Sequence, residues 1–130
     1  MPEFSQSPFP FREYCDLRDA SDLGAFSEDN ATIGLTNTLT GVWLRKGDRL
    51  IAMARIIGDG GCFAQITDVD VHPDFQRQGR AAKIMAQLLQ QARETLPGEL
   101  YLSLIADRGA ENLYAKFGFE PRHAMPLILS

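Results

Sequence analysis

Apolar and polar residues follow two different periods along the chain, and the change of period separates a strand-rich middle from a helical second half. Three segments rich in apolar and β-branched residues predict strands at Thr40–Lys46, Arg49–Gly58 and Phe63–Val71. The connecting segments, Lys46-Gly47-Asp48 and Asp59-Gly60-Gly61, are typical of tight turns. The sequence therefore predicts a meander of three antiparallel strands.

From Gly79 onward the apolar positions recur every three or four residues, which is the period of an amphipathic helix. The stripe consists of Ala81, Ala82, Ile84, Met85, Leu88, Leu89, Ala92 and Leu96. Pro97-Gly98 is expected to end this helix. A short apolar run, Leu100–Ala106, then predicts a buried strand, and Ala110–Phe117 predicts another helix that Asp107 can cap.

The two ends of the chain have weaker patterns. Phe11–Cys15 is expected to pair as a first strand, and weak helical patterns follow at Asp16–Ala20 and Glu28–Leu35. From Phe119 onward we expect a final edge strand, whose pairing is limited by two prolines. Together the elements predict one domain over residues 1–130 with a mixed α/β fold, in which helices cover a mostly antiparallel sheet.

Composition narrows the class of protein. With 130 residues, of which 45% are hydrophobic and 23% charged, the chain is globular in character. Its formal net charge of -4 argues against a dedicated nucleic-acid binder, because phosphate contacts require a basic surface. No stretch approaches the ~20 apolar residues of a membrane span, and the first dozen residues lack the features of a secretory signal. We therefore expect a cytoplasmic protein without nucleic-acid or membrane partners.

Cysteine and histidine do not suggest a metal centre. Cys15 and Cys62 cannot form a disulfide framework, and neither has metal-type spacing with His72 or His123. No metal is therefore expected, and both thiols are expected to be reduced. His72 lies in a turn before Pro73, where we expect a surface histidine rather than a catalytic base.

The segment Asp68–Ala82 carries the clearest candidate chemistry, because a predicted strand there leads through a loop into the long helix. The first turn of a helix leaves backbone N–H groups without partners, and the helix dipole is positive at that end. Gly79 has no side chain to keep an anion away from these amides, and Arg77 and Arg80 add positive charge. This arrangement suits a pyrophosphate, although junctions of this kind with one glycine are more often structural.

Two motifs in the second half resemble those of one family. Gln76-x-x-Gly79-x-Ala81 resembles the acetyl-CoA loop of the GNAT acetyltransferases, which has Gln or Arg, then Gly, then Gly or Ala at this spacing. Asn112–Phe119, reading NLYAKFGF, resembles the second signature of the family, typically an Asn, a Tyr and a closing Phe-Gly-Phe. The interval of one helix and one strand also fits. The resemblance covers Phe63–Pro121 and implies a GNAT-like fold with a splayed coenzyme-binding strand.

The resemblance implies an acetyl-CoA-dependent N-acetyltransferase that transfers an acetyl group to a primary amine of a small molecule by direct attack. It implies that backbone groups of Val69 and Val71 bind the pantetheine arm. The amides expected to hold the pyrophosphate are those of Arg77, Gln78, Gly79, Arg80, Ala81 and Ala82. Asn112 is expected to contact the coenzyme, and Tyr114 to point its hydroxyl at the thioester sulfur. The family resemblance also allows a homodimer.

The reaction needs a base, because an alkylamine with a lysine-like pKa of ~10.4 is only about one part in 10³ neutral at pH 7. Many relatives place Glu or His where this chain has Gln65 and Thr67. Asp68 and Asp70 are the remaining candidates, and Asp68 is predicted to be catalytic, with a structural role weighted equally. Strand alternation predicts both carboxylates on the face opposite Gln65, Thr67 and Val69.

The acceptor pocket is expected near Phe26, Trp43 and Arg55, although aromatic residues in such elements are more often part of the core. The acidic balance of the chain mildly favours cationic amines. Because Gln65 and Thr67 are not bases, an alternative is a catalytically idle acyl-CoA-binding or regulatory module. A protein-amine acetyltransferase is a further alternative. An interaction domain without coenzyme would require both motifs to be coincidental.

Overall fold

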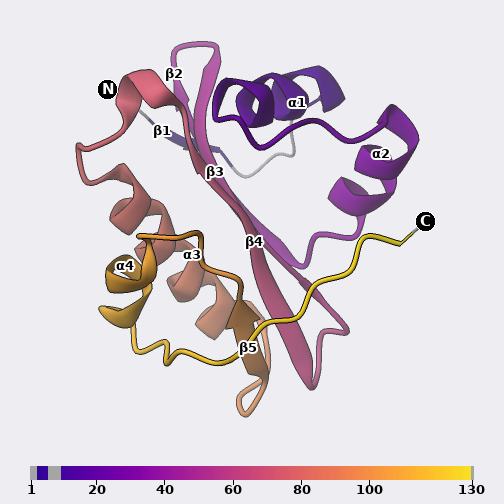
Figure 1. Cartoon of the computed structure of the whole chain (residues 1–130), viewed down its shortest axis with the longest axis vertical. Coiled ribbons are helices and arrows are strands. Elements are labelled where there is room, and N and C mark those ends of the chain that lie inside the picture. The colour runs from indigo at the N-terminus through magenta and orange to yellow at the C-terminus, as the bar shows by residue number, and fades with distance from the viewer. Residues whose placement is uncertain (1–2, 6–9, 130) are drawn as a thin grey trace.

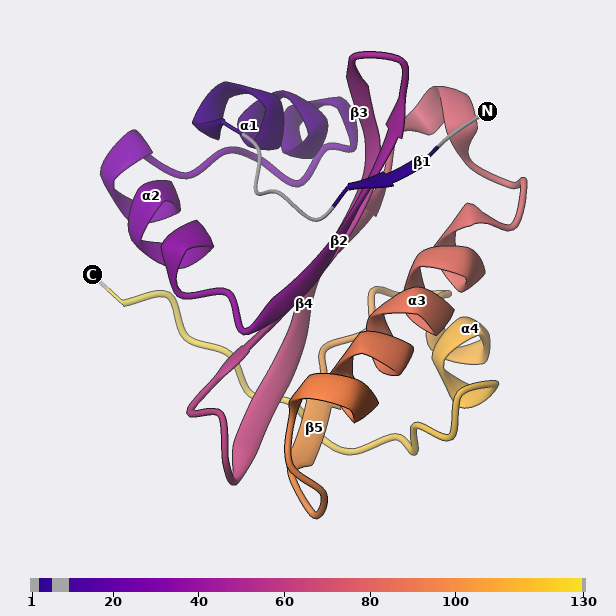
Figure 2. The same cartoon turned by 180° about the vertical axis from the view of Figure 1, so that it is seen from behind.

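The computed structural model describes residues 3–5 and 10–129, which form one five-stranded sheet with helices on both faces (Figures 1 and 2). The strands, in sheet order, are β1 (Glu3–Ser5), β2 (Thr40–Lys46), β3 (Arg49–Gly58), β4 (Phe63–Val71) and β5 (Tyr101–Leu104). The helices are α1 (Phe11–Ala20), α2 (Glu28–Thr36), α3 (Arg80–Thr95) and α4 (Glu111–Ala115), with a 3-10 helix η1 (Pro73–Phe75). Neighbouring strands are antiparallel except β4 and β5. The predicted meander and mixed α/β class are confirmed.

Side-chain alternation along β2 and β3 creates a core on each face of the sheet. Val42 and Leu44 lie on the face covered by α3, whereas Trp43 lies on the face covered by α1 and α2. The predicted stripe of α3 supplies the larger core with four fully or nearly buried residues, namely Ile84, Met85, Leu88 and Leu89. The helical period in this part of the sequence therefore identified the buried face correctly.

The turn from β3 into β4 depends on close backbone packing. Gly58 has a φ of 149°, and a Cβ at this position would stand 2.3 Å from the backbone oxygen of Phe63. The side chain of Asp59 stabilises the following residues, because its Oδ1 accepts backbone N–H bonds from Gly61 and Cys62 at 2.8 Å and from Phe63 at 3.1 Å. Only glycine fits the first position of this turn.

Strand β4 contains a bulge at Asp68, which has a φ of 54°. Arg55 of β3 lies opposite Thr67, and Met53 lies opposite Asp70. The step of two residues along β3 therefore corresponds to a step of three residues along β4, and one extra residue on one strand defines a β-bulge.

The extra residue resets the alternation of β4. The register places Thr67 and Gln65 on the face covered by α1 and α2. Asp68 and Asp70 lie on this same face. Val69 is packed into the core on the α3 face. The prediction that both carboxylates oppose Val69 is confirmed, but the prediction that they oppose Gln65 and Thr67 was wrong, because strict alternation does not continue through a bulge.

Strands β4 and β5 are joined only by a short ladder. Their pairing connects Phe63–Ile66 with Tyr101–Leu104 and extends no further, so the second half of β4 is paired with β3 alone. The expected splay of the coenzyme-binding strand is therefore present in the sheet.

The ends of the chain differ from the prediction. Phe11–Cys15 is not a strand but the first half of α1, in which Tyr14 and Leu17, three residues apart on one helix face, are buried. The first strand is instead Glu3–Ser5. No strand follows Phe119 among the residues described up to 129, so the predicted final edge strand was wrong.

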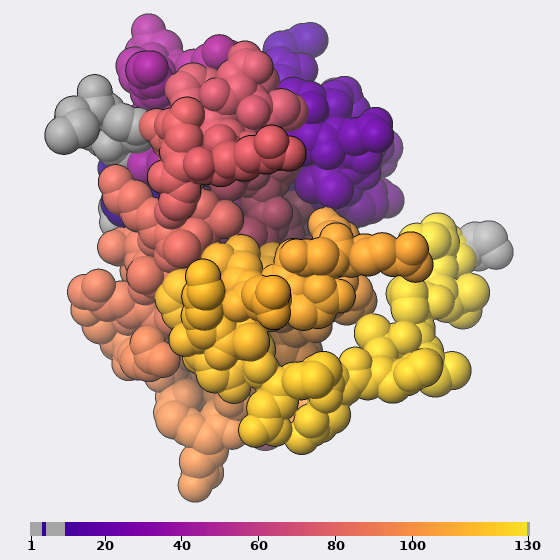
Figure 3. Space-filling view, turned by 60° about the vertical axis from the view of Figure 1, so that its left-hand side comes forward, coloured from indigo at the N-terminus to yellow at the C-terminus, as the bar shows by residue number. Residues whose placement is uncertain are grey.

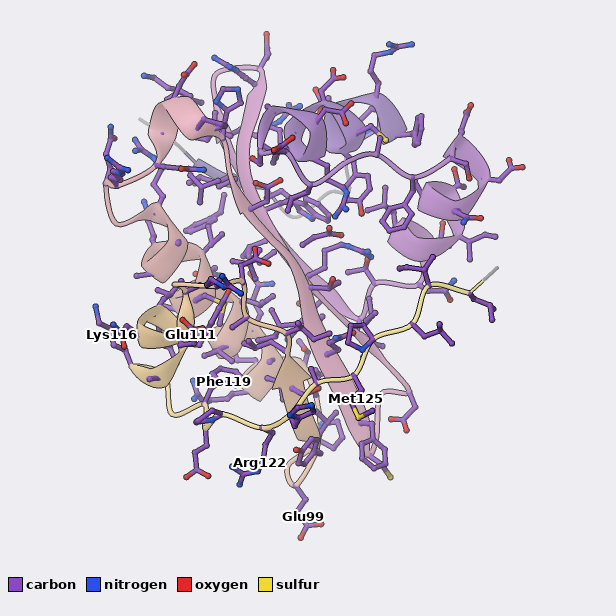
Figure 4. The ribbon with its side chains drawn as sticks, viewed as in Figure 1. Glu99, Glu111, Lys116, Phe119, Arg122 and Met125 are labelled. Atoms are coloured by element: carbon purple, nitrogen blue, oxygen red, sulfur yellow. The ribbon has the colours of Figure 1, made fainter. Side chains whose placement is uncertain are left out.

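The segment after α4 is extended and largely uncovered. It runs past β5 and ends on the side of the sheet that carries α2, and Met125 lies along this path (Figures 1 and 4). Met125 and Leu129 are 86% and 91% exposed. The prolines in this segment lack an N–H donor, which accounts for the missing ladder. At the start of α4, the carbonyl of Asp107, rather than its predicted capping side chain, accepts the N–H of Ala110.

We predict that Gly58→Ala lowers the free energy of unfolding by at least about 2 kcal/mol, because the added methyl collides with backbone atoms that cannot move away independently. Urea unfolding followed by circular dichroism measures the change. Gly98→Ala is the matched control, since no atom lies within 4 Å of the Cβ position there. Equal stability of the two variants would contradict the backbone approach described for this turn.

Candidate active site

The N-terminus of α3 forms an open set of backbone donors at the end of β4. Arg77 and Gly79 both have positive φ, at 64° and 76°, and Gly79 is the N-cap residue without a side-chain cap. The N–H of Lys83 is the first to bond a helix carbonyl, that of Gly79, at 3.1 Å. The N–H groups of residues 80–82 therefore remain available to a ligand. No atom lies within 4 Å of the Cβ position of Gly79, so the amides are accessible.

Positive charge collects beside these amides around the ring of Phe75. Lys46, Arg49 and Arg80 place their cationic groups 5.3, 5.6 and 5.3 Å from the ring centroid. The Arg80 side chain turns back from the helix start, since its Nη1 donates to the Phe75 carbonyl at 3.2 Å and to Gln78. Together the amides and cations make this end of α3 suitable for a phosphate-containing ligand.

The predicted pantetheine-binding residues lie on the splayed half of β4. Val69 is half-buried against the α3-side core, and Val71 is buried. The carbonyl of Val71 already accepts from Ser21 Oγ at 3.3 Å and from Gln76 Nε2 at 2.9 Å. The space-filling view shows a hollow between α1 and the segment after β5, with β4 at its base (Figure 3).

Asp68 is the centre of a buried network on the other face of β4. Its Oδ2 accepts hydrogen bonds from the Tyr14 hydroxyl at 2.7 Å and from Arg55 Nε at 2.9 Å. Its Oδ1 accepts a hydrogen bond from Arg18 Nη1. The Asp68 side chain is 3% exposed. Both oxygens of this carboxylate are therefore engaged, by donors from α1 and from β3.

The network also fixes the properties of its neighbours. Burial raises the pKa of Tyr14 to about 12, and the hydrogen bond to the Asp68 carboxylate contributes further. Tyr14 consequently remains a hydrogen-bond donor across the physiological range. Arg55 Nη1 donates to the Gly34 carbonyl at 2.9 Å and to Thr38 Oγ1 at 2.8 Å, which ties the end of α2 to the network.

Asp70 lies two residues beyond Asp68 on β4 and differs from it in the hydrogen bonding of its carboxylate. It is 4% exposed, and its Oδ2 has no hydrogen-bond partner among the residues described. Burial raises its pKa to about 6, with further increases from the carboxylates of Asp68 and Asp107, while Ser21 and Arg18 oppose the shift. A buried carboxylate with an unengaged oxygen and a pKa near neutrality has the properties required of a general base.

Tyr114 lies in α4 on the opposite side of the splay. Its side chain is buried, and its ring packs edge-on against Phe119, whose place below α4 is labelled in Figure 4, with the centroids 6.3 Å apart. Burial raises the pKa of its hydroxyl, and the Asp107 carboxylate adds to the increase. Asp107 therefore acts electrostatically on both Tyr114 and Asp70. Asn112 is exposed on α4.

The residues expected to form the acceptor pocket are only partly brought together. Trp43 is buried in the core beneath α1, whereas Phe26 and Arg55 line a pocket of about 310 Å³ beside α2. His72 lies in the turn as a partly exposed histidine, with its side chain 16% exposed; its Nδ1 accepts the N–H of Asp74 and its Nε2 lies 2.9 Å from Arg49.

Sequence reasoning missed the contributions of Tyr14 and Arg18, because α1 was read partly as a strand. The helical spacing of Tyr14 and Arg18 is the signal that would have placed both on one face of α1.

Comparison with known proteins decides the family. A model of the acetyltransferase (GNAT) family matches residues 3–119. This chain belongs to the GNAT family. Curated relatives of this GNAT protein include the uncharacterized N-acetyltransferases ycf52 of Porphyra purpurea, 38% identical over 79 residues, and of Pyropia yezoensis, 37% identical over 71 residues. These matches cover 58% and 55% of this chain but only 44% and 40% of the relatives, so the chain spans less than half of their length.

Solved structures agree with the assignment to the GNAT family. SA2161 of Staphylococcus aureus, a protein of unknown function described as a probable acetyltransferase, is 34% identical with a TM-score of 0.91, covering 99% of this chain and 100% of that chain. The ribosomal-protein-S18-alanine N-acetyltransferase of Escherichia coli is 19% identical with a TM-score of 0.78, covering 95% of this chain and 80% of that chain. The second match shows the fold alone.

Two further properties of the GNAT chain concern residues 3–5 and 10–129. Within these ranges no helix combines the length and apolar character needed to cross a bilayer. No group of three or more His, Cys, Asp or Glu side chains is arranged there to hold a metal ion.

We predict that Asp68→Asn lowers the free energy of unfolding by about 3–5 kcal/mol, because two largely buried guanidinium groups lose their counter-charge. Chemical denaturation at neutral pH measures the loss. Asp74→Asn serves as the control, since the Asp74 carboxylate is exposed and lies 3.9 Å from Arg49 and 3.8 Å from His72, and we expect a change within about 0.5 kcal/mol. An Asp68→Asn protein as stable as the control would exclude the structural role described for the network.

Proposed function

We propose that this chain, acting as a single domain over residues 1–130, is an acetyl-CoA-dependent N-acetyltransferase that acetylates a primary amine of a small molecule by direct attack. The observation that carries the proposal is the arrangement around the splay. Asp70, which has an unengaged carboxylate oxygen, lies on the part of β4 beyond its pairing with β5. The open amides are at the start of α3, which follows β4, and Tyr114 lies in α4, which follows β5. Family membership supports the use of acetyl-CoA.

The proposed coenzyme contacts are mainly with backbone groups at the end of β4 and the start of α3. The amides of Arg77, Gln78, Gly79, Arg80, Ala81 and Ala82 are proposed to bind its pyrophosphate, with the cations around Phe75 offsetting its negative charge. Backbone groups of Val69 and Val71, where β4 lacks a β5 partner, are proposed to bind the pantetheine arm, and Asn112 to contact the coenzyme. When bound, acetyl-CoA supplies an acetyl thioester.

We propose Asp70 as the general base in place of Asp68, because the oxygens of Asp68 are already engaged by three donors. With a pKa of about 6, Asp70 lies closer to the pKa of an alkylamine, ~10.4, than an ordinary Asp does. Relative to an ordinary Asp with a pKa of ~3.9, proton transfer from the amine becomes easier by about 3 kcal/mol. The oxygen without a partner is the atom that accepts this proton.

Tyr114 is proposed to donate a hydrogen bond to the departing sulfur. Burial, which raises the pKa of the hydroxyl, keeps the proton on the oxygen at neutral pH. Since a phenol of pKa ~10 is a weaker acid than a thiol of pKa ~8.5, complete proton transfer is unfavourable, and stabilisation of the developing negative charge is the role that the residue can perform.

The proposed function is tested by measuring thiol release from acetyl-CoA with a panel of primary amines. We predict that kcat/KM rises with pH through an apparent pKa of about 6, because Asp70 must be ionised to accept a proton, and levels off above it. Asp70→Asn should lower kcat at least a hundredfold. A continued unit slope from pH 7 to 9, or an active Asp70→Asn variant, would remove Asp70 from the mechanism.

A stability measurement separates this catalytic loss from misfolding. A carboxyl group whose pKa is raised in the folded state destabilises that state once it ionises, so the cost to the wild type grows between pH ~4 and about 6 and is complete above this range. Asp70→Asn should therefore be at least as stable as the wild type at pH 7.5. Stabilisation by CoA without thiol release from any amine would favour the idle acyl-CoA-binding module instead.

We predict that Tyr114→Phe lowers turnover at least tenfold with little change in the affinity for acetyl-CoA, since only the hydroxyl is removed. Steady-state kinetics and a binding titration with CoA measure the two quantities. Tyr101→Phe is the control, because Tyr101 is an exposed tyrosine on β5 and should have wild-type turnover. Unchanged turnover in Tyr114→Phe would exclude the residue from the reaction.

A further inference from the structure

The pocket beside α2 contains one charged residue. This space of about 310 Å³ lies between α1, α2 and β3, and Arg55 is the only charged side chain among the residues that line it. Phe26 and Ile33 line it as well, and they are 51% and 64% exposed. The pocket therefore combines an apolar surface with one buried cation, in a chain whose net charge is -4.

The guanidinium of Arg55 has one nitrogen that the fold does not use. Nε donates to Asp68, and Nη1 donates to Gly34 and Thr38. Nη2 has no hydrogen-bond partner among the residues described, and it retains contact with solvent. It lies 3.8 Å from the position that a Cβ on Gly34 would take, and Gly34 also lines the pocket. An arginine fork with an open nitrogen is a donor suited to a carboxylate.

The charge balance of the network favours an anion at this nitrogen. Arg18 and Arg55 share the single carboxylate of Asp68, so the three side chains carry one surplus positive charge. An anionic group beside Arg55 would offset this surplus within the pocket, which Asp70 does not line.

We propose that the acceptor is an aliphatic ω-amino acid, whose carboxylate binds Arg55 Nη2 while its amine meets Asp70. This inference rests on the proposed acetyltransferase function. Along β3, Arg55 lies two residues from Met53, which is the strand partner of Asp70, so the backbone positions of Arg55 and Asp70 are offset by ~7 Å along the strand direction. An acceptor that reaches both residues therefore needs several methylene groups between its carboxylate and its amine. The exposed Phe26 and Ile33 offer apolar surface to such a chain.

The first test compares acceptors that differ only at the carboxylate end. Thiol release from acetyl-CoA is measured with 5-aminopentanoate, its neutral amide 5-aminopentanamide, and pentylamine. We expect kcat/KM for 5-aminopentanoate to be at least tenfold higher than for the other two. Equal values would overturn the inference and leave the acetyltransferase function intact, whereas absence of thiol release with every amine in the panel would overturn both.

The second test blocks the open nitrogen without removing Arg55, whose loss could unfold the protein. Gly34→Leu places a side chain over Nη2, and no other atom lies within 4 Å of the new Cβ. Thr32→Leu adds the same side chain to an exposed position of α2 outside the pocket. We expect Gly34→Leu to abolish the preference for 5-aminopentanoate over its amide without changing KM for acetyl-CoA, and Thr32→Leu to retain the preference. A folded Gly34→Leu protein with the full preference would overturn the inference.

Discussion

The buried carboxylate of Asp68 connects the parts of the molecule that surround the candidate site. It accepts hydrogen bonds from Tyr14 and Arg18 of α1 and from Arg55 of β3, and Arg55 in turn holds the end of α2. Moving two guanidinium groups and a carboxylate out of water is costly, and the hydrogen bonds to Asp68, Gly34 and Thr38 offset part of that cost. The network therefore favours one arrangement of α1, α2 and the sheet, and this arrangement positions the residues that line the pocket beside α2.

Two aspartates separated by one residue consequently have different chemistry. Asp68 is surrounded by donors, while Asp70 is buried with an oxygen that has none. The bulge brings both side chains to the face that carries Thr67, α1 and α2, where only Asp68 lies among the arginine and tyrosine donors.

Much of the fold could be predicted from local patterns. The three central strands and the stripe of α3 follow from periodicity and turn residues, and both motifs that resemble the GNAT family lie within residues 3–119, which the family model matches. The errors arose where a non-local term decides. Whether Phe11–Cys15 forms a helix depends on packing against β3 and β4. The positive φ of Asp68 is not visible in a sequence of alternating residues, so its role could not be separated from that of Asp70.

The short parallel ladder between β4 and β5 has a thermodynamic consequence for the ligand-free protein. Only four residue pairs join β4 to β5, the strand that leads into α4. The segment from α3 to α4 is otherwise held to the sheet by the contacts of α3 and α4 with the core. A molecule that enters the gap and bonds the free edge of β4 would take the place of the absent strand. A ligand in this gap would therefore make β5 and α4 unfold more cooperatively with the rest of the sheet. Amide exchange in β5 and α4 should then slow when the gap is filled.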